Sequence, residues 1–387
     1  MFDQRTIAFF ERRATPFYYY DMELLHATLK QLQTGLKNHG IKAHYAIKAN
    51  VQKPLLEAIA SYGLGADCVS AEEIKVALKA GFKPRDIFFA GVGKTDSEIR
   101  FALKAGIGCF NVESVPELQA IDAIAARLGA KAHIALRINP DIDAHTHKYI
   151  STGLEENKFG ISRPEFAAVQ QALRRSHNLE FEGLHFHVGS QILDMEVFAL
   201  LCQKAGQIVE QFSAQGFNSR IIDLGGGLGV DYLEPDLHPV PDFEGLLRTI
   251  RANIQETEGQ QVHIEPGRSV VAQCGSLISR AVFVKEGQKK KFLILDAGMN
   301  DLIRPALYGA YHSVQNLTPG PGAKEEVYDI VGPVCESSDT WGEGRIIPAA
   351  RRGDLFAIRS AGAYGQTMSM KYNCRKLAKA YYSDNLD

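Results

Sequence analysis

The sequence has no long apolar run, no regularly spaced cysteines and no excess of charge of either sign. No apolar run approaches the ~20 residues of a membrane-spanning helix, and no basic segment with an apolar core opens the chain, so we expect neither a membrane span nor a secretion signal. A formal charge of −2 argues against nucleic acid or an anionic membrane as the main partner. The six cysteines form no CxxC pair, which favours reduced thiols over disulfides or a metal site. We therefore expect a cytoplasmic protein without a metal.

The chain instead has an ordinary globular composition and a regular alternation of short apolar runs with amphipathic segments. Its 387 residues, 45% of them hydrophobic, suit two domains or one barrel with an addition. The predicted strands lie near residues 43–48, 65–69, 86–90, 108–112, 132–138, 180–187, 220–224 and 261–265. The predicted helices lie near residues 53–62, 71–80, 95–105, 114–128, 164–175, 194–215 and 242–257. Such strand–helix units predict the α/β class and a TIM-like (β/α)₈ barrel, with a doubly wound open sheet as the alternative.

The pattern changes after residue 268, where helical periodicity becomes scarce. β-prone runs separated by Gly, Pro and Asn turns predict a mostly antiparallel β-domain of sandwich or barrel type. These runs lie at residues 277–285, 291–295, 327–331 and 354–359. The aromatic run from Phe17 to Tyr20 is a candidate for a further strand of the same sheet.

These patterns assign residues 21–268 to the barrel, and residues 1–20 with 269–387 to the β-domain. The segment 139–163 is long for a connection between a strand and a helix, which indicates a binding loop or a lid.

Polar residues gather at the carboxyl ends of the predicted barrel strands, where such barrels carry their chemistry. The first strand ends in Lys48 and the second in Asp67. Because a lysine is almost never buried without a partner, Lys48 is either an amine that forms a Schiff base with an aldehyde cofactor or a side chain that extends out of the strand to water. His185 and His187 end the sixth strand. A lone histidine there is typical of the core, but it can also stack on a flat cofactor.

Glycines and an acidic turn follow the last two strands of the predicted barrel. Gly225-Gly226-Gly227 ends the seventh strand, and Glu265-Pro266-Gly267-Arg268 ends the eighth. Glycine lets the backbone approach a ligand and point its N–H groups at an anion, and loops at these positions commonly hold phosphate. A plain tight turn is the alternative. Ser190 and Arg268 are further candidate phosphate ligands. Glu265 could pair with Arg268 or hold the proton of a pyridinium ring.

Four motifs in this order resemble one family. YAIKAN around Lys48, HFHVGSQ around His187, GGGLG from Gly225 and EPGR from Glu265 are similar to the pyridoxal-phosphate enzymes of the alanine-racemase fold type, and within them to the ornithine/diaminopimelate decarboxylase group. The resemblance implies that pyridoxal 5'-phosphate is the cofactor, that Lys48 carries it, that Glu265 bonds the pyridine nitrogen and that His187 packs on the ring. The other implied cofactor-binding residues are Asp67, Ser190, Gly225, Gly226, Gly227, Gly267, Arg268 and Tyr364.

Segments of the second domain are similar to the diaminopimelate versions of the family motifs, namely residues 301–308, 332–337 and 360–365. This resemblance implies that meso-diaminopimelate is decarboxylated to L-lysine. The end of the substrate that does not react carries a carboxylate and an ammonium, and a pocket must satisfy both. The residues suited to this substrate are Arg268, Arg304 and Tyr308 for the carboxylate, Glu336 for the ammonium, and Tyr364.

Cys335 is the candidate acid that protonates the reacting carbon after CO₂ leaves, because a thiol is mostly protonated at neutral pH. The alternative is a small buried hydrophobic residue, the commoner fate of a free cysteine. In relatives the Cys-Glu segment reaches the active site of the partner subunit, so the resemblance implies a homodimer with shared active sites.

Other functions remain open at this point. A decarboxylase of the same fold could act on ornithine, arginine or carboxynorspermidine. Alanine racemase is disfavoured because such enzymes set an arginine, not Glu265, against the ring nitrogen. A carrier or decoy on the same barrel would lack the β-domain or the residues Lys48 and Cys335. A dinucleotide enzyme is disfavoured because no GxGxxG follows the first strand.

Overall fold

The computed structural model describes residues 2–142 and 158–385, which fall into two compact units. The barrel unit comprises Leu29–Gly229 and Asp242–Gly267, and the β-unit comprises Met1–Thr28, Val230–Pro241 and Arg268–Asp387. The sequence pattern gave no indication that residues 230–241 group with the β-unit. No helix among the described residues is long and apolar enough to cross a membrane.

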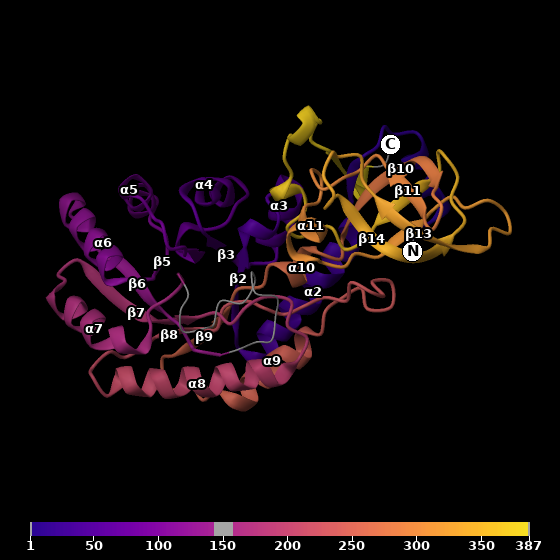
Figure 1. Ribbon diagram of the computed structural model, residues 1–387. Helices are drawn as coiled ribbons and strands as arrows, with labels where there is room; N and C mark the ends of the chain where they lie inside the picture. The colour runs from indigo at the N-terminus through magenta and orange to yellow at the C-terminus, as the bar shows by residue number, and fades with distance from the viewer. Residues whose placement is uncertain (1, 143–157, 386–387) are drawn as a thin grey trace. The chain divides into compact units, whose positions relative to one another are not determined.

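The barrel unit is a closed ring of parallel strands, eight within the described residues (Figure 1). The strands are β2 (Lys42–Ala46), β3 (Gly65–Cys68), β4 (Ile87–Phe89), β5 (Cys109–Val112), β6 (Ala132–Ile138), β7 (Leu179–Phe186), β8 (Ile221–Asp223) and β9 (Gln261–Ile264). The ring closes where β2 pairs with β9, with Ala43 opposite Ile264. The predicted (β/α)₈ barrel is therefore confirmed, and the open sheet is excluded.

Helices connect the strands of the barrel, and α5 to α8 lie outside the ring in Figure 1. Helix α2 (Met22–His39) precedes the first barrel strand. The connecting helices are α3 (Lys53–Ser61), α4 (Ala71–Lys79), α5 (Asp96–Ala105), α6 (Val115–Leu128), α7 (Phe166–Arg175), α8 (Met195–Ser213) and α9 (Phe243–Asn253). The hydroxyls of Ser70, Thr95 and Ser114 accept backbone N–H groups at the starts of α4, α5 and α6. These caps satisfy amides that have no partner within the helix, so each helix starts at a defined residue.

The lower interior of the barrel is filled by side chains from β2, β4, β5, β6 and β9. Phe88, Cys109 and Ala135 form a buried cluster. Above Phe88 stack His44 and His263, whose Nε2 and Nδ1 atoms lie 2.9 Å apart. This layer is packed with side chains. The polar side chains that follow it along the strands therefore gather at the carboxyl end of the ring.

One expected strand ends earlier than its sequence pattern suggests. We expected Lys48 to be the last residue of the first barrel strand, but β2 ends at Ala46 and Lys48 lies in a short 3-10 turn, η1 (Ile47–Ala49). The pairing of β2 with β3 ends at Ala46 opposite Asp67, so no neighbouring strand extends the ladder further. Lys48 therefore follows the strand instead of ending it.

The long segment after β6 is described only at its two ends. Gly160 donates its N–H to Glu113 Oε2 over 3.0 Å, and Ile161 bridges to Ile138. The remainder of the expected binding loop, residues 143–157, lies outside the described residues.

The β-unit is a mostly antiparallel sheet, as the sequence predicted. Its strands are β1 (Phe17–Tyr20), β10 (Gly275–Glu286), β11 (Lys291–Leu295), β12 (Val314–Asn316), β13 (Glu325–Val331), β14 (Thr340–Pro348), β15 (Leu355–Ile358) and β16 (Lys379–Tyr382). The N-terminal aromatic run joins the sheet, with Phe17 opposite Ile278. The parallel pairs are β11 with β13 and β1 with β16. The short α-helices in the described part of this unit are α1 (Gln4–Glu11), α10 (Arg268–Val271) and α11 (Arg304–Tyr308).

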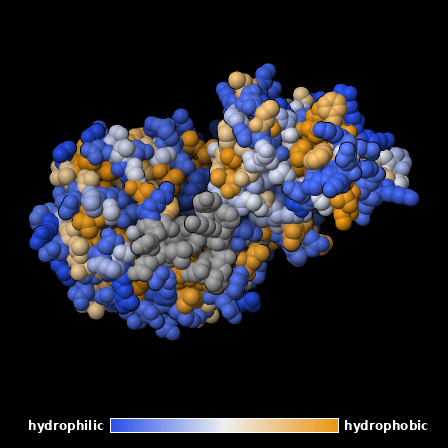
Figure 2. Space-filling model, in the orientation of Figure 1, coloured by the Kyte–Doolittle hydropathy of each residue, from blue (hydrophilic) through white to orange (hydrophobic). Residues whose placement is uncertain are grey.

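Hydrophilic residues cover much of the face seen in Figure 2 and are interrupted by small hydrophobic patches. In the β-unit, the paired residues Val327 of β13 and Ile346 of β14 are both exposed.

Candidate active site

Lys48 and Asp67 lie together at the carboxyl end of the barrel. Lys48 Nζ is 3.8 Å from Asp67 Oδ2, and the lysine side chain is 45% exposed whereas the aspartate is 2% exposed. Asp67 Oδ1 has no hydrogen-bond partner in the described part of the chain. Burial and the nearby Glu265 charge raise the pKa of Asp67 to about 8. An exposed amine thus sits beside a buried carboxyl group that retains its proton at neutral pH.

Glu265 follows β9 and is held from two sides. Its Oε2 lies 3.0 Å from His185 Nε2, and its Oε1 accepts from Asn111 Nδ2 over 3.3 Å. Burial by itself raises the pKa of Glu265, but His185 and Lys48 outweigh it and lower the pKa to about 2. The carboxylate is therefore ionised, although only 6% of the residue is exposed. The sequence gave Asn111 no role, because nothing near it in the chain indicates its distant partner.

Asp223 lies close to Glu265 and holds the glycine loop. Its Oδ1 accepts the N–H of Gly225 over 2.9 Å, and its Oδ2 has no hydrogen-bond partner within the described residues. Burial and the Glu265 charge raise the pKa of Asp223 well above its usual value. Asp223 thus fixes the start of the loop through its bond to Gly225.

The glycine loop requires glycine for steric reasons. Gly225 and Gly227 have φ angles of 68° and 132°, in the region that glycine favours. A Cβ on Gly225 would collide with the carbonyl oxygen of Phe186, and a Cβ on Gly226 would collide with that of Glu265. The loop is therefore pressed against the ends of β7 and β9.

His187 follows β7 and contacts this loop. Its Nδ1 accepts the N–H of Gly226 over 3.3 Å. Burial and the charge of Arg137 lower the pKa of His187 well below its usual value, so the ring is neutral. Further along, the N–H of Ile192 donates to the Gly227 carbonyl over 2.9 Å, which ties the segment carrying Ser190 to the glycine loop. Gly225 and Gly226, both expected to bind phosphate, thus donate to protein acceptors here.

The β-unit contains two buried arginines around one tyrosine. Arg268 begins α10 and Arg304 begins α11, and each is 5% exposed. Arg268 Nη1 donates to Tyr232 Oη over 2.7 Å, and the guanidinium of Arg304 lies over the Tyr232 ring at 4.8 Å. Arg268 also lies over the Tyr364 ring at 5.0 Å, and this tyrosine has a positive φ of 53°. The sequence did not indicate Tyr232, which lies in a connecting segment without a recognisable motif.

Arg304 has no carboxylate partner among the described residues. Its Nη1 donates to His312 Nε2 over 2.8 Å, and its Nε has no hydrogen-bond partner in the same set. Burial and the charge of Arg268 lower the pKa of Arg304. Because buried charges are normally paired, this arrangement is typical of a site that accepts an anionic ligand.

Cys335 and Glu336 lie on an exposed turn of the β-unit. The N–H of Cys335 donates to Asn373 Oδ1 over 3.1 Å, and Tyr372 Oη donates to Glu336 Oε1 over 2.5 Å. Both residues are exposed, so Cys335 is not the small buried residue of the alternative interpretation. Tyr308 is half-buried at the end of α11.

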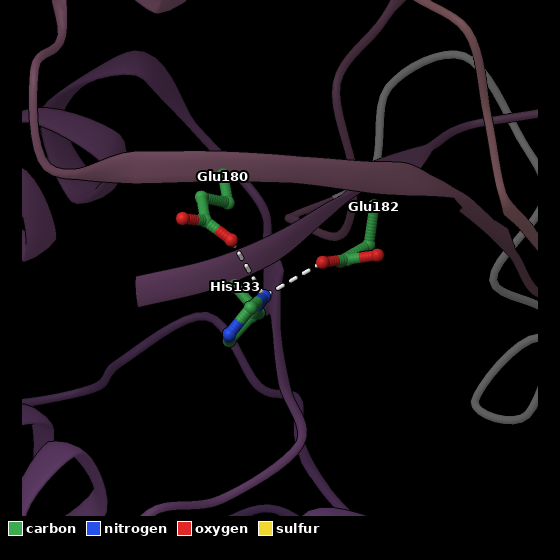
Figure 3. Close-up of side chains that lie close together, drawn as sticks. All are labelled: His133, Glu180 and Glu182. Atoms are coloured by element: carbon green, nitrogen blue, oxygen red, sulfur yellow. Dashed lines mark hydrogen bonds and ion pairs between the residues drawn. The ribbon is translucent and has the colours of Figure 1, made fainter. Parts of the chain in front are cut away.

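A second cluster of ionisable groups lies near the starts of β6 and β7 (Figure 3). His133 Nδ1 is 2.6 Å from Glu182 Oε1 and 3.4 Å from Glu180 Oε2. Arg220 Nη2 lies 2.8 Å from the same Glu182 oxygen. Because Arg220 already neutralises Glu182, we interpret this cluster as a surface ion-pair network.

Comparisons with known proteins agree with this geometry. The family described as "Pyridoxal-dependent decarboxylase, pyridoxal binding domain" matches residues 23–272. The diaminopimelate decarboxylase of Bacteroides thetaiotaomicron is 50% identical over 378 residues, which are 97% of each chain. The crystal structure of the Helicobacter pylori diaminopimelate decarboxylase complexed with L-lysine is 42% identical, with a TM-score of 0.88 over 97% of this chain and 94% of that one.

A third similarity is to the M. jannaschii diaminopimelate decarboxylase in co-complex with L-lysine, which is 33% identical with a TM-score of 0.89 over 99% of this chain and 90% of that one. The protein is therefore a pyridoxal-dependent decarboxylase with the fold of alanine racemase. Within that class, the chain belongs to the diaminopimelate decarboxylase family.

Proposed function

We propose that this protein decarboxylates meso-2,6-diaminopimelate to L-lysine and CO₂, the last step of lysine biosynthesis, with pyridoxal 5'-phosphate as its cofactor. The observation that carries the choice of substrate is the buried Arg304, which has no carboxylate partner among the described residues and lies close to Arg268. The relatives named diaminopimelate decarboxylase and the solved structures complexed with L-lysine support the same substrate.

The polar groups of the barrel unit fit pyridoxal phosphate. They comprise the exposed amine of Lys48, the ionised buried carboxylate of Glu265 and the neutral imidazole of His187. The glycine loop adds a backbone that leaves no room for a Cβ at Gly225 or Gly226. When bound, the cofactor supplies a protonated ring that takes up the electron pair left by the departing CO₂.

Each barrel residue then has a distinct task. Lys48 would hold the cofactor through its amine. The Glu265 carboxylate would accept a hydrogen bond from the protonated nitrogen of the cofactor ring and keep that nitrogen protonated. His187 would pack against the ring, and Asp67 lies beside Lys48. The proposed phosphate ligands are Ser190, Gly225, Gly226, Gly227, Gly267, Arg268 and Tyr364. For Gly225 and Gly226, the N–H groups would have to exchange their bonds to Asp223 and His187 for bonds to the phosphate.

The β-unit residues bind the end of the substrate that does not react. Arg268, Arg304 and Tyr308 bind its carboxylate, Glu336 binds its ammonium, and Tyr364 also contacts the substrate. Ornithine has no second carboxylate, so it would leave the buried Arg304 without an anion. Since an unpaired buried charge costs free energy, diaminopimelate is favoured over such diamine precursors.

Cys335 donates a proton to the carbon from which CO₂ has departed. We further propose a cytoplasmic homodimer in which Cys335 and Glu336 serve the active site of the other subunit. Their exposure on a single chain supports this assignment. The exposed pair Val327 and Ile346 offers apolar area in the same unit for a subunit contact.

The test is a substrate panel with the cofactor-loaded protein. We expect lysine and CO₂ from meso-diaminopimelate, and far slower turnover of ornithine, arginine and carboxynorspermidine. Lys48→Ala should abolish turnover and lose the adduct that borohydride traps on the wild-type lysine. Turnover of ornithine without turnover of diaminopimelate would contradict the proposal.

A further inference from the structure

His312 lies between α11 and β12 and is 1% exposed. Its two ring nitrogens make two different contacts. Nε2 lies 2.8 Å from Arg304 Nη1, and Nδ1 lies 2.8 Å from the carbonyl oxygen of Arg359. Its ring lies nearly perpendicular to that of Tyr232, with an angle of 76° between the planes and the ring centroids 5.0 Å apart. The histidine thus contacts an arginine of the proposed substrate site and the backbone of the sheet at the same time.

These two partners permit only one protonation state. A guanidinium can only donate hydrogen bonds, so His312 Nε2 must be the acceptor. A carbonyl oxygen can only accept, so Nδ1 must carry the proton. The ring is therefore the neutral Nδ1–H tautomer, and a doubly protonated ring would lose the bond to Arg304 and set two cations against each other.

The partner on the sheet side is held by two further contacts. Arg359 follows β15, and its N–H donates to the Ser313 carbonyl over 2.9 Å, which continues the antiparallel pairing of β12 with β15. Its side chain pairs with Asp236 at 2.9 Å. The carbonyl that accepts the hydrogen bond from His312 is therefore held in place by the sheet. Because the imidazole bonds both this carbonyl and Arg304, the position of the sheet fixes the position of the guanidinium.

We infer that His312 is a positioning residue that holds the Arg304 guanidinium for the carboxylate of the substrate end that does not react. This inference rests on the proposed function and deepens it, because it assigns the support of a specificity-determining arginine. Burial and the charges of Arg304, Arg268 and Arg345 lower the pKa of His312 to about 3. The histidine therefore stays neutral, and its support of Arg304 persists, at neutral pH.

A neutral support differs physically from an acidic one. An aspartate or glutamate against Arg304 would neutralise the guanidinium and reduce its attraction for the substrate carboxylate. An imidazole satisfies one donor, fixes the side chain and leaves its positive charge for the ligand. Because the arginine is oriented before the ligand arrives, less ordering entropy is lost on binding.

The first experiment uses the cofactor-loaded enzyme and a matched pair of probes. L-lysine has the carboxylate and cadaverine is the same diamine without it. His312→Phe removes both hydrogen bonds but keeps a ring beside Tyr232. His312→Gln places an amide oxygen toward Arg304 and an amide nitrogen toward the Arg359 carbonyl. The control is Tyr328→Phe, which removes a buried hydroxyl that bonds the Ala350 N–H of the same unit over 3.1 Å.

We expect His312→Phe to weaken L-lysine binding and raise KM for diaminopimelate about tenfold or more, the typical effect of losing a hydrogen bond to a charged group. Cadaverine binding and kcat should change far less. His312→Gln should recover most of the lysine affinity, and Tyr328→Phe should leave it unchanged. Equal loss of lysine and cadaverine binding in His312→Phe, or equal loss in Tyr328→Phe, would overturn the inference.

The second experiment does not depend on substrate. Nitrogen NMR of the histidine-labelled enzyme, with the His312 signal identified by its absence in His312→Gln, should show the neutral Nδ1–H tautomer down to about pH 4. A protonated ring near pH 6, or the Nε2–H tautomer, would overturn the inference even if diaminopimelate is the substrate. If the wild type neither binds lysine nor acts on diaminopimelate, the proposed function fails and the role of His312 fails with it, whatever its tautomer.

Discussion

The Glu265 carboxylate lies 3.0 Å from His185 Nε2, and neither residue is more than 6% exposed. The pair joins the ends of β7 and β9, which are not neighbours in the ring, since β8 lies between them. Asn111 of β5 holds the other carboxylate oxygen. The acidic partner proposed for the cofactor ring is thus fixed from two strands across the barrel interior.

Removing the histidine should release this carboxylate. In His185→Phe, Glu265 loses its largest favourable charge interaction, so its pKa should rise from about 2 and an acidic limb should appear in the pH dependence of kcat. Cofactor affinity should fall about tenfold or more, as expected for a lost hydrogen bond to a charged group. Equilibrium dialysis of the cofactor and a pH–rate profile measure both effects.

The matched control is His133→Phe, since His133 also pairs with glutamates but near the strand starts. This control should leave cofactor affinity unchanged. If both variants lose affinity equally, the effect of His185 is general destabilisation and not support of Glu265.

The buried Asp67 should make the cofactor-free protein less stable as pH rises. Its pKa is raised to about 8 in the folded state, facing Glu265, Lys48, Glu73 and Arg137. Above its usual pKa the unfolded chain releases the proton while the folded chain keeps it. Stability therefore falls with rising pH until about pH 8, by up to about 1.4 kcal/mol per pH unit.

Asp67→Asn removes this titration while keeping the size of the side chain. We expect the free energy of unfolding of the variant, relative to that of the wild type, to be higher at pH 8 than at pH 5. Denaturant unfolding of the cofactor-free proteins at the two pH values measures this difference. A constant difference between the two pH values would show that Asp67 is ionised in the folded protein.

The glycine loop should not accept a methyl group. In Gly225→Ala the new Cβ collides with the Phe186 carbonyl, and a φ of 68° adds strain. We therefore expect the free energy of unfolding to fall by about 2 kcal/mol or more, and the cofactor to bind more weakly. Gly216→Ala is the matched control, because its φ is 86° and a Cβ there meets nothing within 4 Å. The control should lose only the stability that backbone strain costs, so its loss should be smaller. Similar losses of stability in both variants would show that the collision with the Phe186 carbonyl does not matter.

The sequence predicted the barrel strands because they follow from local patterns, whereas the residues of the proposed site came from the ends of those strands and from the family resemblance. Short apolar runs between glycine turns mark β2 to β9, and the carboxyl ends of parallel strands meet on one face. Strand β14, Thr340–Pro348, was missed because its two glycines and charged residues interrupt the alternation.

The supporting residues could not be found in this way. Asn111, Tyr232 and His312 act through partners that are distant in the chain or lie in segments without a motif, as with Asn111 and Glu265, which are separated by 154 positions. Their roles depend on which atoms face each other after folding. A sequence pattern predicts the element on which a residue lies, but not its hydrogen-bond partner in the folded protein.

A shared active site makes a prediction that no single-chain mechanism allows. Lys48→Ala removes the cofactor amine in the barrel unit, and Cys335→Ala removes the proposed acid on an exposed turn of the β-unit. If Cys335 serves the other subunit, a mixed dimer of the two variants contains one site with both residues intact and one site with neither.

Random reassembly of the two inactive proteins should then restore about a quarter of wild-type turnover, since about half of the dimers are mixed and each has one working site. Turnover measured before and after mixing, with size-exclusion chromatography to confirm exchange, checks this. If both residues served the same chain, each site of a mixed dimer would lack one of them and no activity would return.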